Sequence, residues 1–374
     1  MIPQLLFIVA LLLISVGLSA KPVPGPKEST EKIRLELVDS AFLQVNEAQD
    51  YWAFVPTADK YYFVDNWSGL ICVYDHQGRF IRRIGTIGKG PGKFSWVLGI
   101  AVQDSVVYGT GKNSILINKF DTAGKFLDYW KLDSIQYASG MLNLCVVGDG
   151  SLLADQTYRG ELEPILTKRG KFKGPYPVSP LMRIDFPERK THRIAFTLKA
   201  WSEIKVARNY PEFWNVLTAP APFSPDKAYC CWNGIPSLFE IDTRLCTGKK
   251  LCDIPILDWI DVHKQEMEEM DWPNRINSFT TCRVSGRLLF FVDVNKQRRA
   301  GKSDSPEMDR REYYFVDSTG SIAYMDRNAD SSANDAGIYM QNNAAYFCTV
   351  NAGWDPVNGK GTLRVRRFAI KQIK

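Results

Sequence analysis

Histidine is scarce in this chain, and the motifs that would mark a zinc site or a hydrolase are missing. The sequence of 374 residues has three histidines, His76, His192 and His263, which are far apart, and it contains no Cys-x-x-Cys pair. Common zinc sites are built from such closely spaced ligands. Gly-x-Ser-x-Gly and His-Glu-x-x-His are also absent, which removes two common hydrolytic motifs. We therefore predict no catalytic residue and no metal ligand.

The chain also lacks a strong charge bias. Its 47 basic and 41 acidic residues leave a formal net charge of +6, which is mild for this length and does not favour nucleic acid as a partner. The basic segment 295–311 is interrupted by Asp304, Glu307 and Asp309. We interpret it as a solvated loop.

The N-terminus has the pattern of an export signal. Residues 4–20 are almost entirely apolar and end in the small-x-small site Leu18-Ser19-Ala20, which predicts a signal peptide over residues 1–20. The alternative is an uncleaved anchor, but the stretch is short for a membrane span of about 20 residues. Residues 21–32 contain three prolines and are expected to form a linker. The mature chain is thus predicted to be periplasmic or secreted, with no transmembrane span.

A short pattern recurs along the chain. Asp75-x-x-Gly-Arg-Phe-Ile is followed 46 residues later by Asp121-x-x-Gly-Lys-Phe-Leu. Looser copies begin at Asp317 and at Asp242, the latter with an insertion before Gly248. Apolar or alternating runs flank each copy, so that each predicts a strand, a tight turn and a second strand. A hairpin with a period of about 40–50 residues is typical of a β-propeller blade.

Six blades account for residues 33–374, which we predict to be one all-β propeller. Blade three is the least regular, and its outer strands are expected at 163–168 and 172–178. The last blade lacks a fourth strand, whereas residues 33–39 alternate cleanly and have no blade of their own. We therefore expect 33–39 to pair with 362–370 and close the ring, which would leave no wide unpaired edge.

The eight cysteines show no disulfide framework. Cys72, Cys145, Cys282 and Cys348 fall inside expected strands, where a cysteine usually acts as a small buried apolar residue. Cys246 and Cys252 flank an expected turn and could pair across it. Adjacent Cys230 and Cys231 would point to opposite faces of a strand and are not expected to bond to each other.

The segment Ile84–Phe94 carries four glycines but matches neither a Walker A loop nor a Rossmann loop, and we interpret it as a connection between blades. Together with the preceding hairpin and Tyr62-Phe63-Val64-Asp65, it resembles the six-bladed β-propeller proteins exported by Bacteroidetes, relatives of the NHL-repeat propellers. The resemblance covers residues 60–130 and implies fold, not activity. Many of these proteins are lipoproteins, but this chain has Lys21 where their cysteine would stand.

The long connections of the predicted propeller fall on one face. They are expected at 85–96, 179–213, 255–278, 295–311 and 351–361, all between strands D and A or between strands B and C. Aromatic residues and one arginine in or beside them are candidate contacts for a protein, peptide or glycan: Trp96, Trp201, Arg208, Tyr210, Trp214, Trp272 and Trp354.

Two other interpretations remain open. Each tryptophan could instead pack its loop onto the rim of the ring. A metal-dependent hydrolase or lyase at the central tunnel is the alternative function, since six-bladed propellers include calcium-dependent lactonases and zinc lyases. No cofactor is predicted for the binding function, whereas calcium would suit the alternative.

Overall fold

The computed structural model describes residues 28–29, 32–43, 51–65, 68–111, 116–132, 143–155, 181–196, 216–222, 224–232, 237–254, 275–296, 310–326, 333–355 and 360–373. These residues form strands and turns and no helix, so no described helix could cross a membrane. The expected signal peptide and most of the expected linker lie outside the described residues.

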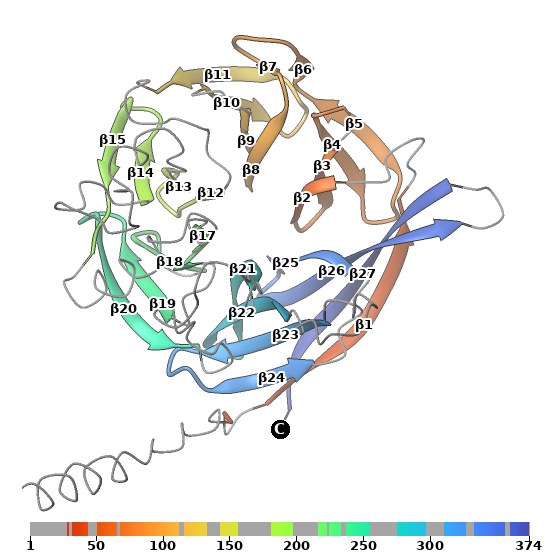
Figure 1. Cartoon of the computed structure of the whole chain (residues 1–374), viewed down its shortest axis with the longest axis vertical. Helices are drawn as coiled ribbons and strands as arrows, with labels where there is room; N and C mark the ends of the chain where they lie inside the picture. The colour runs from red at the N-terminus through yellow and green to blue at the C-terminus, as the bar shows by residue number, and fades with distance from the viewer. Residues whose placement is uncertain are drawn as a thin grey trace, which may run out of the picture.

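Six blades, each built on four antiparallel strands, are arranged around a central axis (Figure 1). In each blade, we name the strands A to D from the axis outward. The A strands are β2 (Tyr51–Pro56), β8 (Val97–Gln103), β12 (Leu144–Val146), β17 (Val216–Pro220), β21 (Arg275–Val284) and β25 (Ala333–Gln341). The B strands are β3 (Lys60–Asp65), β9 (Val106–Gly111), β13 (Leu152–Asp155), β18 (Lys227–Trp232), β22 (Arg287–Lys296) and β26 (Ala344–Asp355).

The outer half of each blade completes the ring. The C strands are β4 (Ile71–Asp75), β10 (Leu116–Asp121), β14 (Leu181–Asp185), β19 (Ser237–Asp242), β23 (Arg310–Asp317) and β27 (Lys360–Gln372). The D strands are β5 (Phe80–Ile84), β11 (Phe126–Lys131), β15 (Lys190–Arg193), β20 (Thr247–Asp253), β24 (Ile322–Asp326) and β1 (Ile33–Phe42). The predicted fold class, an all-β six-bladed propeller, is confirmed.

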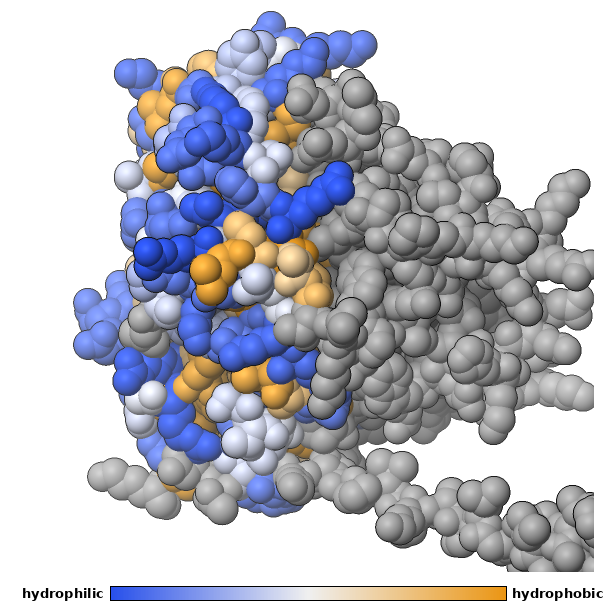
Figure 2. All heavy atoms as spheres, turned by 90° about the vertical axis from the view of Figure 1, so that its left-hand side faces the viewer, coloured by the Kyte–Doolittle hydropathy of each residue, from blue (hydrophilic) through white to orange (hydrophobic). Residues whose placement is uncertain are grey.

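The hydrophobic core lies between neighbouring blades. Because side chains alternate along a strand, each blade presents one apolar face to the blade before it and one to the blade after it. Phe291 of blade five and Phe347 of blade six, both fully buried, lie 4.8 Å apart between ring centroids. The outer wall is different, because the D strands border solvent: hydrophilic residues and smaller apolar areas alternate over the described wall in Figure 2.

The N-terminal strand closes the ring, as predicted. β1 pairs antiparallel with β27, from Ile33 opposite Gln372 to Phe42 opposite Arg364, with a bulge between Leu37 and Asp39. Arg367 of β27 also forms a bidentate ion pair with Asp39 of β1. Closure therefore joins the two ends of the described chain by backbone and side-chain bonds.

Blade three differs from the prediction. Its outer strands are β14 and β15, not the segments 163–168 and 172–178, which lie outside the described residues. Residues 181–185, 190–193 and 195–196 of the expected loop 179–213 are therefore strand, and His192 lies on β15. A further short strand, β16 (Ala195–Phe196), pairs parallel with β20 and adds a fifth strand to blade four. The outer strands of this blade were not recognised in the sequence because the turn between its C and D strands has no glycine.

In the Asp-x-x-Gly turns of blades one, two and five, the aspartate side chain accepts a hydrogen bond from the amide four residues later. In blade one, the Asp75 side chain accepts hydrogen bonds from the amides of Gln77 and Arg79 at 3.0 and 2.8 Å. Gly78 takes a positive φ of 81°, which a residue with a side chain rarely adopts. The fourth expected copy is different: Gly248 lies in β20, and its turn places Cys246 at positive φ.

The glycine-rich segment connects blades one and two. It holds the short parallel strands β6 (Thr86–Ile87) and β7 (Lys93–Phe94). Phe94 is buried between the blades, and a Cβ on Gly85 or Gly109 would lie 2.5 or 2.8 Å from its ring. These glycines therefore make room for the phenyl ring.

All eight cysteines are unpaired, as expected for those inside strands. The suggested Cys246–Cys252 bridge is wrong. Cys246 precedes β20 and Cys252 lies near its far end, so that about 20 Å of extended chain separates them, far beyond disulfide reach.

Candidate functional site

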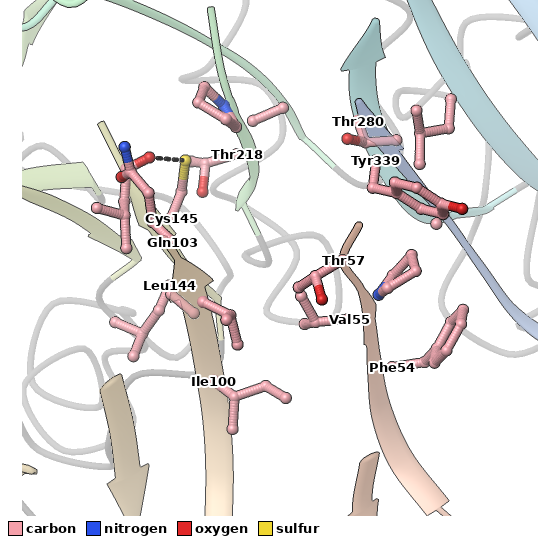
Figure 3. A pocket seen from close by; sticks show the side chains of 18 of the residues that line it. Phe54, Val55, Thr57, Ile100, Gln103, Leu144, Cys145, Thr218, Thr280 and Tyr339 are labelled. Carbon is pink, nitrogen blue, oxygen red and sulfur yellow. Dashed lines mark hydrogen bonds between the residues drawn. The ribbon is translucent and has the colours of Figure 1, made fainter. Parts of the chain in front are cut away.

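A cavity of about 730 Å³ occupies the centre of the ring. All six A strands line it, and in Figure 3 their side chains face one another across an open space. This volume lies within the range of about 300–1,000 Å³ that is usual for small-ligand pockets. The cavity therefore has room for a small ligand.

The cavity wall is mostly apolar, with uncharged hydrogen-bonding groups set into it. Its two charged residues among the described lining are Asp59 and Asp104, both at A–B turns. Asp59 pairs with Lys60 at 2.8 Å. Burial acts to raise the pKa of Asp59, but the hydrogen bond and charge of Lys60, together with hydrogen bonds from Thr57 and the backbone, hold that pKa below its usual value. The uncharged polar residues of the wall are Thr57, Gln103, Asn143, Thr218, Ser278, Thr280, Thr281 and Tyr339.

Three of the lining residues, Gln103, Cys145 and Thr218, form what we call the polar corner. They come from the A strands of consecutive blades, β8, β12 and β17, and they lie together on one wall in Figure 3, away from Thr57 and Tyr339. Burial raises the pKa of the Cys145 thiol to about 12, although Thr218 acts to lower it. The thiol is therefore neutral at physiological pH and unsuited to act as a nucleophile or metal ligand there.

A buried ion pair supports the wall in blade five. Ser278, which lines the cavity, donates a hydrogen bond to Asp293 at 3.2 Å, and Arg311 binds both oxygens of the same carboxylate. Burial raises the pKa of Asp293 even though Arg311 opposes the change. Because its oxygens are already engaged by Ser278 and Arg311, we interpret Asp293 as structural. Across the described residues, no group of three or more His, Cys, Asp or Glu lies close enough to hold a metal ion.

The two rims of the ring carry different kinds of loop, because the order of the strands in each blade assigns each loop to one rim. The A–B and C–D turns share one rim, here called the turn face. The D–A and B–C connections share the other, here called the connection face. The longest connections join β13 to β14, β16 to β17, β20 to β21 and β22 to β23. Because strands A to D are antiparallel and β16 runs parallel to the D strand β20, all four begin and end at the connection face.

The structure places two of the predicted contact residues. Trp96 is 36% exposed and sits beside Gly69 in the B–C connection of blade one, at the connection face. Trp354 lies in β26 opposite Gly361, so that residues 351–355 and 360–361 of the expected loop 351–361 are instead paired strand. The other five, Trp201, Arg208, Tyr210, Trp214 and Trp272, lie outside the described residues. The predicted set is therefore not shown to meet at one site.

The polar corner was missed by the sequence reasoning. Gln103 and Thr218 are single uncharged residues near or within short apolar runs, and nothing in the local pattern separates them from ordinary strand residues. Only the ring closure brings the three blades to one wall. The position of Gln103 and Thr218 on expected A strands is the one sequence signal that indicates a place at the central axis.

A ring of six four-stranded blades around an axial cavity defines the protein as a six-bladed β-propeller. A family described as "6-bladed beta-propeller" matches residues 51–149, which include most of the segment whose resemblance to the exported Bacteroidetes propellers was predicted. That resemblance is confirmed, while the relation to NHL repeats stays a prediction. No curated protein matches the sequence.

Solved structures share the fold at low sequence identity. A Bacteroides vulgatus protein of the DUF4221 family is 10% identical, with a TM-score of 0.56, and the match covers 92% of this chain and 100% of that one. A Bacteroides fragilis protein named as exported is 12% identical, with a TM-score of 0.51 and coverage of 92% and 98%. A gluconolactonase from Xanthomonas campestris is 12% identical, with a TM-score of 0.51 and coverage of 93% and 99%.

Proposed function

We propose that the protein is an exported binding module that recognises a protein, peptide or glycan at its connection face, with the axial cavity receiving part of the ligand. The observation that carries this proposal is the cavity itself, with a volume suited to a ligand and a wall of apolar and uncharged polar groups. Its lining reaches from Leu98 and Leu217, near the connection face, to the turn-face residues Asp59 and Asp104. A ligand held at the connection face would thus meet the cavity mouth.

The long connections supply the rest of the argument. They are rich in tryptophan and tyrosine in the sequence, and such residues give large, rigid contact areas at low entropic cost. Export rests on the N-terminal signal pattern, and the exported neighbour from Bacteroides fragilis is consistent with it.

The test is a glycan and peptide binding screen with the chain from Lys21 to Lys374. For any ligand found, Trp201→Ala and Trp272→Ala should each weaken binding while leaving the melting temperature unchanged. Tyr129→Ala on the outer wall is the aromatic control, and Arg79→Ala on the turn face is the second control. If both controls abolish binding and the two tryptophan variants do not, the connection face is not the binding face.

The alternative is a metal-dependent hydrolase or lyase at the same cavity. It is favoured by the fold that the chain shares with the Xanthomonas gluconolactonase, and calcium would be its cofactor. The check is hydrolysis of gluconolactone with and without added calcium. Calcium-dependent turnover that is lost on chelation would replace the binding proposal with the enzymatic one.

A further inference from the structure

Two polar atoms of the cavity wall are buried and have no hydrogen-bond partner within the described part of the chain. They are Oε1 of Gln103 and Oγ1 of Thr218. The Cys145 thiol beside Thr218 is only a weak hydrogen-bonding group, and it donates instead to the Val146 carbonyl at 3.6 Å. Four other hydroxyls of the wall are engaged, those of Thr57, Ser278, Thr281 and Tyr339. Thr281, for example, donates to the carbonyl of Pro220 at 2.5 Å. An unpaired buried polar atom normally requires an explanation, because its desolvation is not compensated.

The surroundings of these two oxygens indicate which kind of ligand could form hydrogen bonds with them. Gln103 ends β8 and lines both the axial cavity and a second cavity of about 390 Å³, whose wall also includes Pro220, Pro222 and Pro225. A ligand filling the polar corner would therefore meet two uncharged hydrogen-bonding groups beside extensive apolar surface. No Lys or Arg is among the described lining residues, and Asp59 and Asp104 would repel an anion.

We propose that the polar corner binds a hydroxyl-bearing ring of a neutral saccharide. A sugar ring has hydroxyl groups that can donate to Gln103 Oε1 and exchange a hydrogen bond with Thr218 Oγ1. Its C–H faces can pack against the apolar wall. This inference rests on the proposed binding function and narrows it to one ligand class and one part of the cavity.

The first test needs no ligand. Thr218→Val and Gln103→Met remove the unpaired oxygens with little change of shape, so the melting temperature of the free protein should stay the same or rise. Thr281→Val is the matched control on the same wall. It leaves the Pro220 carbonyl unpaired and should lower the melting temperature by roughly 2 °C or more. If Thr218→Val and Gln103→Met destabilise the protein as much as Thr281→Val, both oxygens are already bonded within the protein, and the proposal fails.

The second test measures sugar binding by calorimetry and ligand-observed NMR. The probes are glucose, galactose, mannose, N-acetylglucosamine and their β-linked disaccharides, with glucuronate as the charged comparison. A neutral sugar should bind, and glucuronate should bind more weakly. Thr218→Val and Gln103→Met should each weaken that binding by about tenfold, which corresponds to about 1.4 kcal/mol.

The outcomes separate this inference from the proposed function. If no neutral sugar binds but a peptide does, the saccharide proposal is wrong and the binding module stands. If a sugar binds and Trp272→Ala weakens it while Gln103→Met does not, the connection face alone holds the ligand and the polar corner is not its site. Loss of sugar binding in Gln103→Met and Thr218→Val, with stability retained, supports the proposal directly.

Discussion

The turns between strands C and D fall into two groups, and the comparison shows which part of the repeat is constant. In blades one, two and five, an aspartate and a glycine hold the turn, with φ values of 81°, 84° and 84° at Gly78, Gly124 and Gly320. In blades three and four, Arg189 and Cys246 take positive φ values of 56° and 51°. The aspartate remains in both groups and accepts backbone hydrogen bonds. The turn therefore depends first on its aspartate, and the glycine is replaceable in some blades.

The glycines have a second role that differs from blade to blade. A Cβ on Gly78 would lie 2.1 Å from the carbonyl oxygen of Phe42, on the D strand of blade six. On Gly320 it would lie 2.6 Å from the carbonyl oxygen of Asp253, on the D strand of blade four. On Gly124 its nearest neighbour would be an Ile84 side-chain atom at 3.5 Å, an ordinary contact. The turns of blades one and five thus press against the preceding blade more closely than the turn of blade two.

Deleting residues 33–42 should have the largest effect on this arrangement. It removes β1, on which the blade-one turn rests, and leaves β27 with an open edge and unpaired backbone groups. We expect a sharp fall in the melting temperature or the loss of cooperative unfolding. Differential scanning calorimetry would measure either outcome. The control deletes residues 21–27, before the described ring. Equal stability of the two deletions would show that closure by β1 contributes little.

Alanine substitutions at the three glycines should separate the two roles. Each forces an alanine to positive φ, at a cost of about 1–2 kcal/mol. Gly78→Ala and Gly320→Ala add a clash with a backbone carbonyl, which we expect to cost roughly 1–3 kcal/mol more. Urea unfolding of the three variants is the measurement. Equal losses at Gly78 and Gly124 would mean that the tight approach to blade six has no energetic weight.

The sequence predicted the repeated part of this fold and not the rest, for physical reasons. The Asp-x-x-Gly turn is local, so that Asp75 and Gly78 can be recognised without knowing what surrounds them. Blade three was misplaced because the positive φ of its turn lies on Arg189, which no turn rule favours. That residue is held from outside the blade, since its guanidinium binds the Asp128 carboxylate and the Tyr129 carbonyl of blade two. The polar corner likewise depends on three blades meeting, which local patterns do not encode.

The blade-one turn differs from its counterparts in holding a histidine. His76 donates from Nε2 to the Thr57 carbonyl at 3.1 Å, and its Nδ1 accepts a hydrogen bond from Arg367 at 2.9 Å. Burial lowers the pKa of His76 and the Arg367 charge lowers it further, while the hydrogen bond to Thr57 and the charges of Asp39 and Asp59 oppose the shift. The folded protein therefore holds a neutral imidazole against the closing strand β27.

Acid should weaken the contact between His76 and β27 and so lower the free energy of unfolding. Because the folded pKa of His76 is lowered, the unfolded chain binds the proton more readily, and stability rises with pH in this range. The contribution should be fully present above about pH 6.5, the ordinary histidine value, and be lost as the pH falls through the folded pKa. His76→Gln keeps an amide donor but no titrating ring, and its urea midpoint should change less between pH 7.5 and 5. Parallel pH profiles for the variant and the original protein would exclude His76 as the titrating group.

The smallest expected effect concerns Cys246, which stands where other blades have glycine. Cys246→Gly relieves the positive φ of 51° but increases the entropy of the unfolded chain and removes a half-buried side chain. These terms oppose each other, so stability should change by less than about 1 kcal/mol.

Cys252→Gly is the matched control, because Cys252 is also half-buried but has an ordinary strand conformation. There the glycine gains nothing from φ and weakens β20, and we expect a loss about 1–2 kcal/mol larger than at Cys246. Urea unfolding of both variants would measure this difference. Equal losses of unfolding free energy would show that the positive φ at Cys246 does not destabilise the protein. Blade four would then not require the glycine found in the turns of blades one, two and five.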